Sequence, residues 1–212
     1  MTDVLQHFRD RGALLEGHFI LSSGLHSPKY LQCALALQRP EDAVRFGEAI
    51  AHLVGTGSSS DRGFEFAEST NAPIAAAPGS GFYTVASPAI GGLVIGFAVA
   101  QALGKRFVWT ERQNGEMTLR RGFEISEGER ILVVEDVITT GGSTRECMDA
   151  LRENGAEIVS AASIIDRSNG TADVVVGRVS LVNLAVPSYL PEECPMCAAG
   201  VEAVKPGSRA SK

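Results

Sequence analysis

Residues 131–144, ILVVEDVITTGGST, constrain the fold of this chain more than any other stretch. The β-branched apolar run at its start predicts a buried strand, and the small polar residues at its end predict a turn into a helix. Glycines let successive backbone N–H groups turn inward, and the start of a helix adds unpaired donors and a positive dipole. The stretch therefore predicts a site for a terminal phosphate group.

Strand and helix patterns alternate along most of the chain. Apolar periodicity predicts helices at 40–54, 90–103 and 142–154, besides a short first helix that Thr2 would cap. Short apolar runs predict strands at 83–87, 106–110, 131–135 and 157–165, and the second half of 111–125 predicts a hairpin. This alternation implies an α/β fold, with a mainly parallel sheet and helices on both faces. In such sheets ligands bind beyond the carboxyl ends of the strands.

Size, charge and composition narrow the class of protein. A chain of 212 residues has room for one large domain, so we treat 1–212 as a single domain. Residues 55–81 are rich in Gly, Ser, Ala and Pro and predict a flexible insertion. The net charge of -6 argues against binding nucleic acid or an anionic membrane. Because the N-terminus lacks the apolar core of an export signal and the cysteines form no disulfide framework, we expect a cytoplasmic protein.

Two adjacent acids, Glu135 and Asp136, lie a few residues before the predicted phosphate site. Carboxylates only accept hydrogen bonds, so they are unsuited to the phosphate itself. They suit a ligand that carries a vicinal diol beside its phosphate, as a ribose 5-phosphate does. A carboxylate at this place could also hold a metal or stabilise positive charge on the sugar ring.

The residues from Val133 to Thr144 resemble the phosphoribosyl-diphosphate motif of type I phosphoribosyltransferases. The resemblance implies that family's fold, a central mainly parallel sheet flanked by helices, with a small N-terminal hood region at 1–40. It also implies that the motif binds phosphoribosyl diphosphate through Glu135, Asp136, Val137, Ile138, Thr139, Thr140, Gly141, Gly142 and Ser143.

Residues 17–30, GHFILSSGLHSPKY, narrow the choice of base, because they resemble the N-terminal segment of orotate phosphoribosyltransferases. The resemblance makes Tyr30 the residue that stacks on orotate. It also relates Asp166 and Arg167 to an Asp-Arg pair whose arginine contacts the orotate carboxylate, a task that suits a planar guanidinium fork. Thr139 is the third residue expected at the base.

The resemblance implies transfer of ribose 5-phosphate from 5-phosphoribosyl 1-diphosphate to orotate, giving orotidine 5′-phosphate and diphosphate in pyrimidine (UMP) biosynthesis. The transition state would resemble an oxocarbenium ion and needs no covalent protein nucleophile. The expected catalytic residues are Asp136, Glu135 and Arg112. Mg²⁺ would be bound mainly through the substrate's diphosphate, and the enzyme would be a homodimer in which the loop carrying Arg112 reaches the neighbouring subunit.

Departures from the family pattern keep two alternatives open. Lysines that are often found in the family are replaced here by Ser22 and Gly91, and the expected mobile loop at 110–116 has one arginine and no lysine. A purine-base phosphoribosyltransferase is one alternative, although Arg167 suits the carboxylate of orotate better. A regulator that binds phosphoribosyl diphosphate without turning it over is the other.

Near the C-terminus, Cys194-Pro195-Met196-Cys197 has metal-ligand spacing but supplies only half of a four-ligand site. A complete site would need a partner chain or Cys33 and Cys147, so we expect a plain turn in the tail at 190–212 and no metal held by the protein. A redox pair or disulfide is a further alternative. His18 and His26 are interpreted as structural residues, and the chain after Gly200 as loose.

Overall fold

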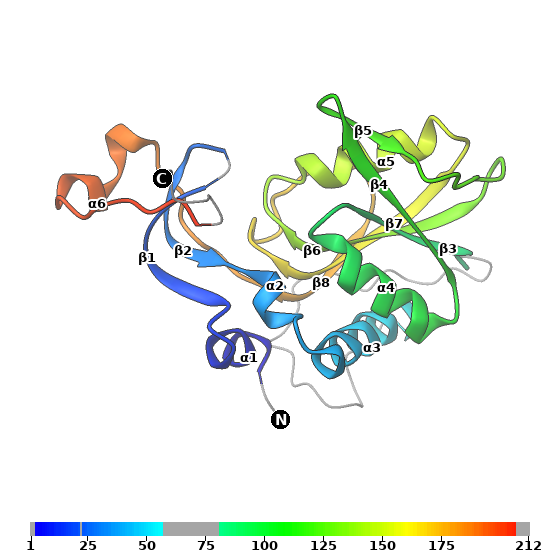
Figure 1. Ribbon diagram of the computed structural model, residues 1–212, viewed down its shortest axis with the longest axis horizontal. Helices are drawn as coiled ribbons and strands as arrows, with labels where there is room; N and C mark the ends of the chain where they lie inside the picture. Colours follow the sequence, from blue (N-terminus) through cyan, green and yellow to red (C-terminus); the bar gives the residue numbers. More distant parts are fainter. Residues whose placement is uncertain (1–2, 22, 57–80, 207–212) are drawn as a thin grey trace.

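The computed structural model describes residues 3–21, 23–56 and 81–206. The predicted insertion at 55–81 therefore falls almost entirely outside the described residues, as does Ser22. Figure 1 shows a large α/β body and a smaller lobe beside it that contains β1, β2 and α6. Among the described helices, none combines the length and the apolar character needed to cross a membrane.

The body is built on a six-stranded sheet with the order β5-β4-β3-β6-β7-β8. All neighbours in it are parallel except β4 and β5, which form an antiparallel hairpin. The strands are β3 (Thr84–Pro88), β4 (Arg106–Gln113), β5 (Glu116–Leu119), β6 (Arg130–Ile138), β7 (Glu157–Asp166) and β8 (Arg178–Asn183). The expected mainly parallel sheet is thus confirmed.

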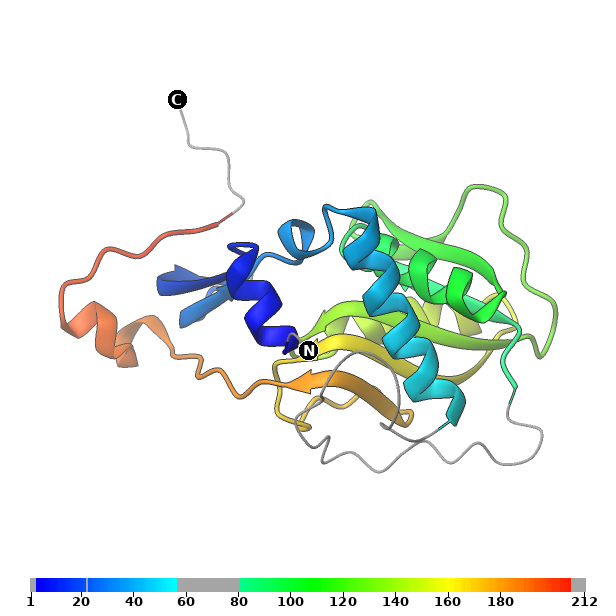
Figure 2. The same ribbon diagram turned by 90° about the horizontal axis from the view of Figure 1, so that it is seen from below.

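Helices cover both faces of this sheet, because alternate residues of its buried strands point to opposite sides. Leu132 and Val134 of β6 pack in the cluster under α3 (Pro40–Thr56) and α4 (Gly92–Leu103). Ile131 and Val133 pack in the opposite cluster, under α5 (Gly142–Arg152). Figures 1 and 2 show this layering.

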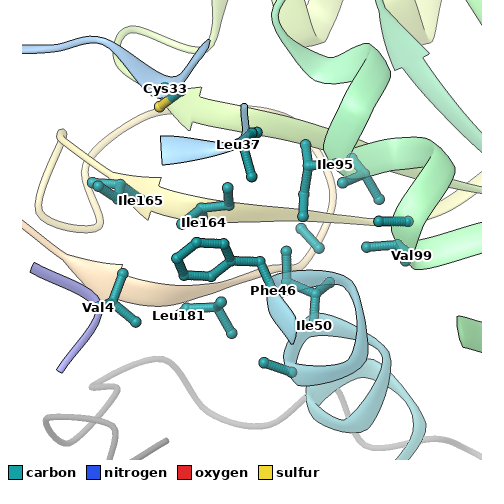
Figure 3. Packing of buried hydrophobic residues seen from close by; sticks show 14 of the residues in the cluster. Val4, Cys33, Leu37, Phe46, Ile50, Ile95, Val99, Ile164, Ile165 and Leu181 are labelled. Carbon is teal, nitrogen blue, oxygen red and sulfur yellow. The ribbon is translucent and has the colours of Figure 1, made fainter. Parts of the chain in front are cut away.

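The larger core lies between the sheet and the two helices α3 and α4. Phe46 and Ile50 of α3 meet Ile95 of α4 and Ile164 of β7 there, as Figure 3 shows. The helices approach closely at Gly47, where an added Cβ would lie 2.6 Å from the backbone carbon of Ala98. Any side chain at Gly47 would therefore push α4 away from α3.

The remaining elements form the smaller lobe and its links to the body. They are α1 (Val4–Asp10), β1 (Leu14–Ile20), β2 (His26–Leu31), α2 (Cys33–Ala36), the 3₁₀ turn η1 (Pro191–Glu193) and α6 (Pro195–Ala198). β1 and β2 pair antiparallel in a sheet of their own. The chain after β8 returns to this sheet: Tyr189 pairs with His26, and Val204 pairs with Phe19.

Several expectations from the sequence need correction. Asp3, not Thr2, caps α1, since its carboxylate accepts the backbone N–H of Leu5 at 3.2 Å. The hairpin forms from the first half of 111–125, because Asn114 and Gly115, both with positive φ, make a tight turn between β4 and β5. Strands β1, β2 and β8 were not predicted. The chain after Gly200 is not loose up to residue 206, because Val204 pairs with β1.

Candidate active site

A large pocket lies at the carboxyl ends of the parallel strands, where ligands of such sheets bind. Its volume is about 940 Å³. The end of β6, the turn into α5, the segment after β7 and residues of the smaller lobe form its wall. The pocket is thus shared between the body and the lobe.

The turn from β6 into α5 forms the floor of the pocket, and every residue from Thr139 to Glu146 lines it. Gly141 caps α5 in the left-handed conformation, with φ +78°. An added Cβ at Gly141 would lie 2.9 Å from Cγ1 of Val174, so this turn requires glycine in both conformation and space. The first N–H groups of α5 have no partner within the helix and can bind an anion here. The predicted phosphate site has the local structure expected for it.

The two acids at the end of β6 have different environments. Glu135 is 7% exposed, and burial raises the pKa of its carboxyl well above the usual range, with the neighbouring charge of Asp136 adding to the shift. Asp136 is half-buried, and its carboxylate accepts the backbone N–H of Val137 at 2.8 Å. Both line the large pocket, but only Asp136 also lines the smaller one beside it. Asp136 is therefore the acid between the two pockets.

Gly91 and Gly92 bring the start of α4 against these acids. An added Cβ on Gly91 would lie 3.0 Å from Oδ1 of Asp136, and one on Gly92 would lie 3.1 Å from Oε1 of Glu135. Because Gly91 has no side chain, the pocket side of Asp136 stays open.

The smaller pocket, of about 330 Å³, adjoins the large one and shares Asp136, Val137, Thr139 and Arg167 with it. Tyr30 and Leu31 of β2 form part of its wall. The predicted base-binding residues Tyr30, Thr139 and Arg167 are thus brought together in one pocket.

With Lys205, Arg167 is one of the two cations that line this smaller pocket among the described residues. Its backbone follows β7, and one terminal nitrogen lies 3.4 Å from Oγ of Ser27 on β2. Burial lowers the pKa of its guanidinium, and its Nε is buried without a hydrogen-bond partner among the described residues. The neighbouring Asp166 does not pair with it, because that carboxylate is held by Arg178 at 3.1 Å and by the backbone N–H of Ser168 at 2.7 Å. Arg167 has donors left for a ligand.

Arg112 also lines the large pocket, but on a strand and not on the expected loop. It is paired across the hairpin with Met117, its guanidinium donates to the carbonyl of Gly115 at 2.7 Å, and it forms an ion pair with Glu146 of α5. The nearby cations Arg120 and Arg121 do not line the pocket and pair with Glu111 instead.

Not every predicted residue faces the site, and some that do were missed. Ile138 is 1% exposed and packs in the core, so its side chain does not reach either pocket. The sequence did not predict Ser168 and residues 171–173, of which Asp173 lies against the phosphate turn, nor Lys205 of the smaller pocket. Lys205 comes from a tail whose return to β1 depends on long-range pairing, which no local pattern reveals.

Comparisons with known proteins agree with this geometry. Residues 77–186 match the family model described as the phosphoribosyl transferase domain. The fold, the acidic pair and the phosphate turn thus define a phosphoribosyltransferase.

Relatives along the whole chain identify the family more closely. The chain is 45% identical over 207 residues to orotate phosphoribosyltransferase of Pelotomaculum thermopropionicum, covering 98% of this chain and 97% of that protein. It is 44% identical over 207 residues to the enzyme of the same name from Carboxydothermus hydrogenoformans, again covering 98% and 97%. The chain belongs to the orotate phosphoribosyltransferase family, and its similarity to that family extends over nearly its whole length.

A solved structure shows the same fold. The crystal structure of orotate phosphoribosyltransferase from Aeropyrum pernix has a TM-score of 0.63 and 23% sequence identity, and the match covers 84% of this chain and 91% of that one.

Proposed function

We propose that this chain is an enzyme that transfers ribose 5-phosphate from 5-phosphoribosyl 1-diphosphate to orotate. The products are orotidine 5′-phosphate and diphosphate, and the reaction belongs to pyrimidine nucleotide synthesis. The observation that carries the choice of base is Arg167, a half-buried side chain whose buried Nε has no hydrogen-bond partner among the described residues, in a pocket that Tyr30 also lines. A planar anion such as orotate fits an aromatic face beside a guanidinium fork.

Each part of the pocket has a role in this proposal. The 5′-phosphate lies in the turn from Thr139 to Ser143, where backbone N–H groups and hydroxyls converge. The ribose hydroxyls face the acids, and orotate lies between Tyr30 and Arg167. Asp136 stands where the two pockets join, which is where the bond between sugar and base would form.

Catalysis rests on positioning and on charge. As the diphosphate leaves, positive charge develops on the ribose ring, and a carboxylate at Asp136 stabilises that charge. Glu135 has a raised pKa and is more easily protonated, so its contribution is to hold the end of β6 by accepting the backbone N–H of Asp136 at 3.2 Å. Orotate N1 attacks the ring carbon, and no protein nucleophile takes part.

The leaving diphosphate needs positive charge, which Arg112 and Mg²⁺ would provide. Carboxylate and hydroxyl oxygens line the pocket, as Mg²⁺ prefers, and we propose that the ion would be bound mainly through the diphosphate, with the carboxylate of Asp136 and the hydroxyl of Thr139 available as oxygen ligands from the chain. The ion would supply charge neutralisation. Arg112 can exchange Glu146 for the diphosphate at little cost, because an exposed ion pair contributes only about 0–1 kcal/mol.

We also propose a cytoplasmic homodimer with 1–212 as one domain, in which β1 and β2 act as the hood over the base. The four cysteines are free in the structure, which suits a reducing compartment.

The dimer is proposed to form through an exposed apolar row at the start of α4 and along it. Ile90, Val94 and Phe97 form this row, with 84%, 47% and 60% of their surfaces exposed, and such a row suits burial against a second copy. Light scattering should give the mass of a dimer, and Phe97→Glu should shift it toward the monomer.

One assay tests the proposed reaction. The protein is mixed with Mg²⁺, 5-phosphoribosyl 1-diphosphate and either orotate, adenine or hypoxanthine, and diphosphate release and the loss of orotate absorbance are followed. We expect turnover with orotate alone. Turnover with a purine, or binding of 5-phosphoribosyl 1-diphosphate without turnover of any base, would contradict the proposal.

A further inference from the structure

Four side chains with metal-binding atoms converge in the smaller lobe, away from the two pockets. They are His18 of β1, His26 of β2, Cys194 and Cys197, and their four ligand atoms all lie within 4.8 Å of one another. Three of them are buried, while Cys197 is exposed. The two cysteines, 168 or more residues away from the histidines in the chain, thus meet them only in the folded lobe.

The hydrogen bond of His18 fixes which ring nitrogen faces the cluster. Its Nδ1 lies 2.7 Å from the carbonyl oxygen of Val201, and a carbonyl can only accept. Nδ1 therefore carries the hydrogen, and Nε2 keeps its lone pair. Metal-binding histidines are usually held in this way, by an outer hydrogen bond that sets the tautomer and the ring orientation.

The distances are close to those of a tetrahedral site. Nε2 of His18 lies 2.7 Å from Nδ1 of His26, 3.5 Å from Sγ of Cys194 and 3.7 Å from Sγ of Cys197. Nδ1 of His26 lies 3.2 Å from Sγ of Cys197. Bonds of about 2.0 Å to nitrogen and about 2.3 Å to sulfur place tetrahedral ligand atoms about 3.3 to 3.8 Å apart. Of these four distances, the one between the two nitrogens is the furthest below this range and must lengthen when an ion binds, while every pair in the cluster already lies within 4.8 Å.

The donor set points to one kind of ion. Two thiolates and two imidazoles suit Zn²⁺, whereas Mg²⁺ and Ca²⁺ prefer oxygen ligands. Four protein ligands leave no open position, which is the arrangement of a structural zinc site. The expected alternative partners are elsewhere: Cys147 packs in the core under α5, and Cys33 lies beside Asp136.

Apart from the backbone pairing at Tyr189 and Val204, the lobe has little apolar contact to hold its tail. Neither η1 nor α6 contains a buried residue, and Leu190, Val201 and Val204 are 46%, 50% and 55% exposed. Apolar burial in this part of the tail is therefore small, and small folded units with little core commonly depend on a metal. Figure 2 shows how far α6 extends from the body before the chain turns back.

We propose that His18 Nε2, His26 Nδ1, Cys194 Sγ and Cys197 Sγ bind one Zn²⁺ ion, which ties the C-terminal tail to β1 and β2. The ion is structural. Because Lys205 and Pro206 line the smaller pocket, the tail that the ion holds also completes the wall of that pocket. The interpretation of residues 194–197 as a plain turn, with no metal held by the protein, is replaced by this proposal.

Metal content of the full chain tests the site directly. Protein purified without chelators should carry about one zinc per chain by mass spectrometry of the elements. The double variant Cys194→Ser/Cys197→Ser should lose it, with at least about a 100-fold weaker affinity for Zn²⁺ against a competing chelator. Cys147→Ala, which changes a cysteine outside the cluster, should keep it.

Cobalt binding gives a second measurement, which depends neither on enzyme activity nor on the folding of the double cysteine variant. Wild-type protein stripped of metal and loaded with Co²⁺ should show the intense visible bands of a tetrahedral ion and thiolate-to-cobalt absorption. His26→Gln should weaken both, so the test holds even where the double variant fails to fold. Wild-type protein without zinc and without these bands, or with Cys194 and Cys197 joined in a disulfide, would overturn the proposal. So would unchanged zinc affinity in the folded double variant.

Discussion

The backbone N–H of Arg167 donates to the carbonyl of Ile138 at 2.8 Å, which joins the ends of β7 and β6. Ile138 is the residue immediately before the phosphate turn, and Arg167 is one of the two described cations that line the smaller pocket. One ladder hydrogen bond therefore sets the spacing between the proposed phosphate site and the proposed base site. That spacing is what a nucleotide, with a phosphate at one end and a base at the other, requires.

Arg167→Lys should raise the KM for orotate by about 10- to 100-fold, because a hydrogen bond to a charged group contributes about 1.5–3 kcal/mol and lysine lacks the guanidinium fork. The KM for 5-phosphoribosyl 1-diphosphate should change little, since the proposed contacts of that substrate are the turn from Thr139 to Ser143, Asp136 and Arg112, and not Arg167. Steady-state kinetics with each substrate varied in turn measures both. An equal rise in the two constants would place Arg167 outside the base site.

Asp136→Asn should lower kcat by about 100-fold, equivalent to about 3 kcal/mol, because the variant cannot offer a negative charge to the developing positive charge on the ribose. Glu135→Gln should lower kcat by less than about 10-fold, since the glutamate is already biased toward its neutral form. Rapid-quench measurement of single turnovers separates this effect from product release. Similar losses in the two variants would contradict the roles assigned to them.

Gly141→Ala should destabilise the protein by about 1–3 kcal/mol, because the position has φ +78° and an added Cβ would meet Val174 at 2.9 Å. For a chain of this size, that loss corresponds to a fall in Tm of roughly 2–10 °C. Gly142→Ala is the matched control. Its Cβ would lie no closer than 3.6 Å to Thr140 Oγ1, so its Tm should stay within about 1 °C of the wild type.

The buried carboxyl of Glu135 should make stability depend on pH. Its pKa is about 4.5 when unfolded and well above that when folded, so between these two values the folded state binds more protons. The free energy of unfolding must then fall as the pH rises through this window, by up to about 1.4 kcal/mol per pH unit. Denaturant unfolding of the wild type and of Glu135→Gln, without Mg²⁺, should show a difference that grows above about pH 4.5 in favour of the variant. A constant difference would mean that Glu135 is not perturbed.

Arg112→Gln should raise the KM for 5-phosphoribosyl 1-diphosphate by about 10-fold, which corresponds to about 1.4 kcal/mol, if the guanidinium meets the diphosphate. Glu146→Gln, which frees Arg112 from its ion pair, should leave this KM unchanged or lower it. Arg121→Gln is the control, because Arg121 pairs with Glu111 outside the pocket. A rise in KM in the Arg121 variant equal to that in the Arg112 variant would indicate a general effect of charge.

The strand, turn and helix of the proposed phosphate site were predictable because their residues are contiguous. One stretch from Ile131 to Thr144 contains the buried strand, the acids and the glycine turn, so local rules suffice. The sheet followed from the same alternation of short apolar runs and helices. The base pocket was reached through the family resemblance, which placed Tyr30 and Arg167 together although 137 residues separate them.

The features that the sequence did not predict depend on contacts between segments that are far apart in the chain. Nothing near Lys205 or Cys194 indicates that the tail returns to β1 and β2, because backbone pairing at Val204 and Tyr189 is set by the folded lobe. The position of Arg112 on a strand, by contrast, could have been predicted from a local sequence signal. The Asn114-Gly115 pair is a strong hairpin signal, and it predicts the observed turn when its two positive φ angles are considered.

The return of the C-terminal tail to β1 affects the order in which the parts of the protein can fold during synthesis. A nascent chain that has left the ribosome only as far as β8 already contains the sheet and the phosphate turn, but Lys205 and Pro206 have yet to reach the smaller pocket. The turn of the proposed phosphate site can therefore form during translation, whereas the proposed base site is complete only after the segment around Val204 has been made and has paired with β1.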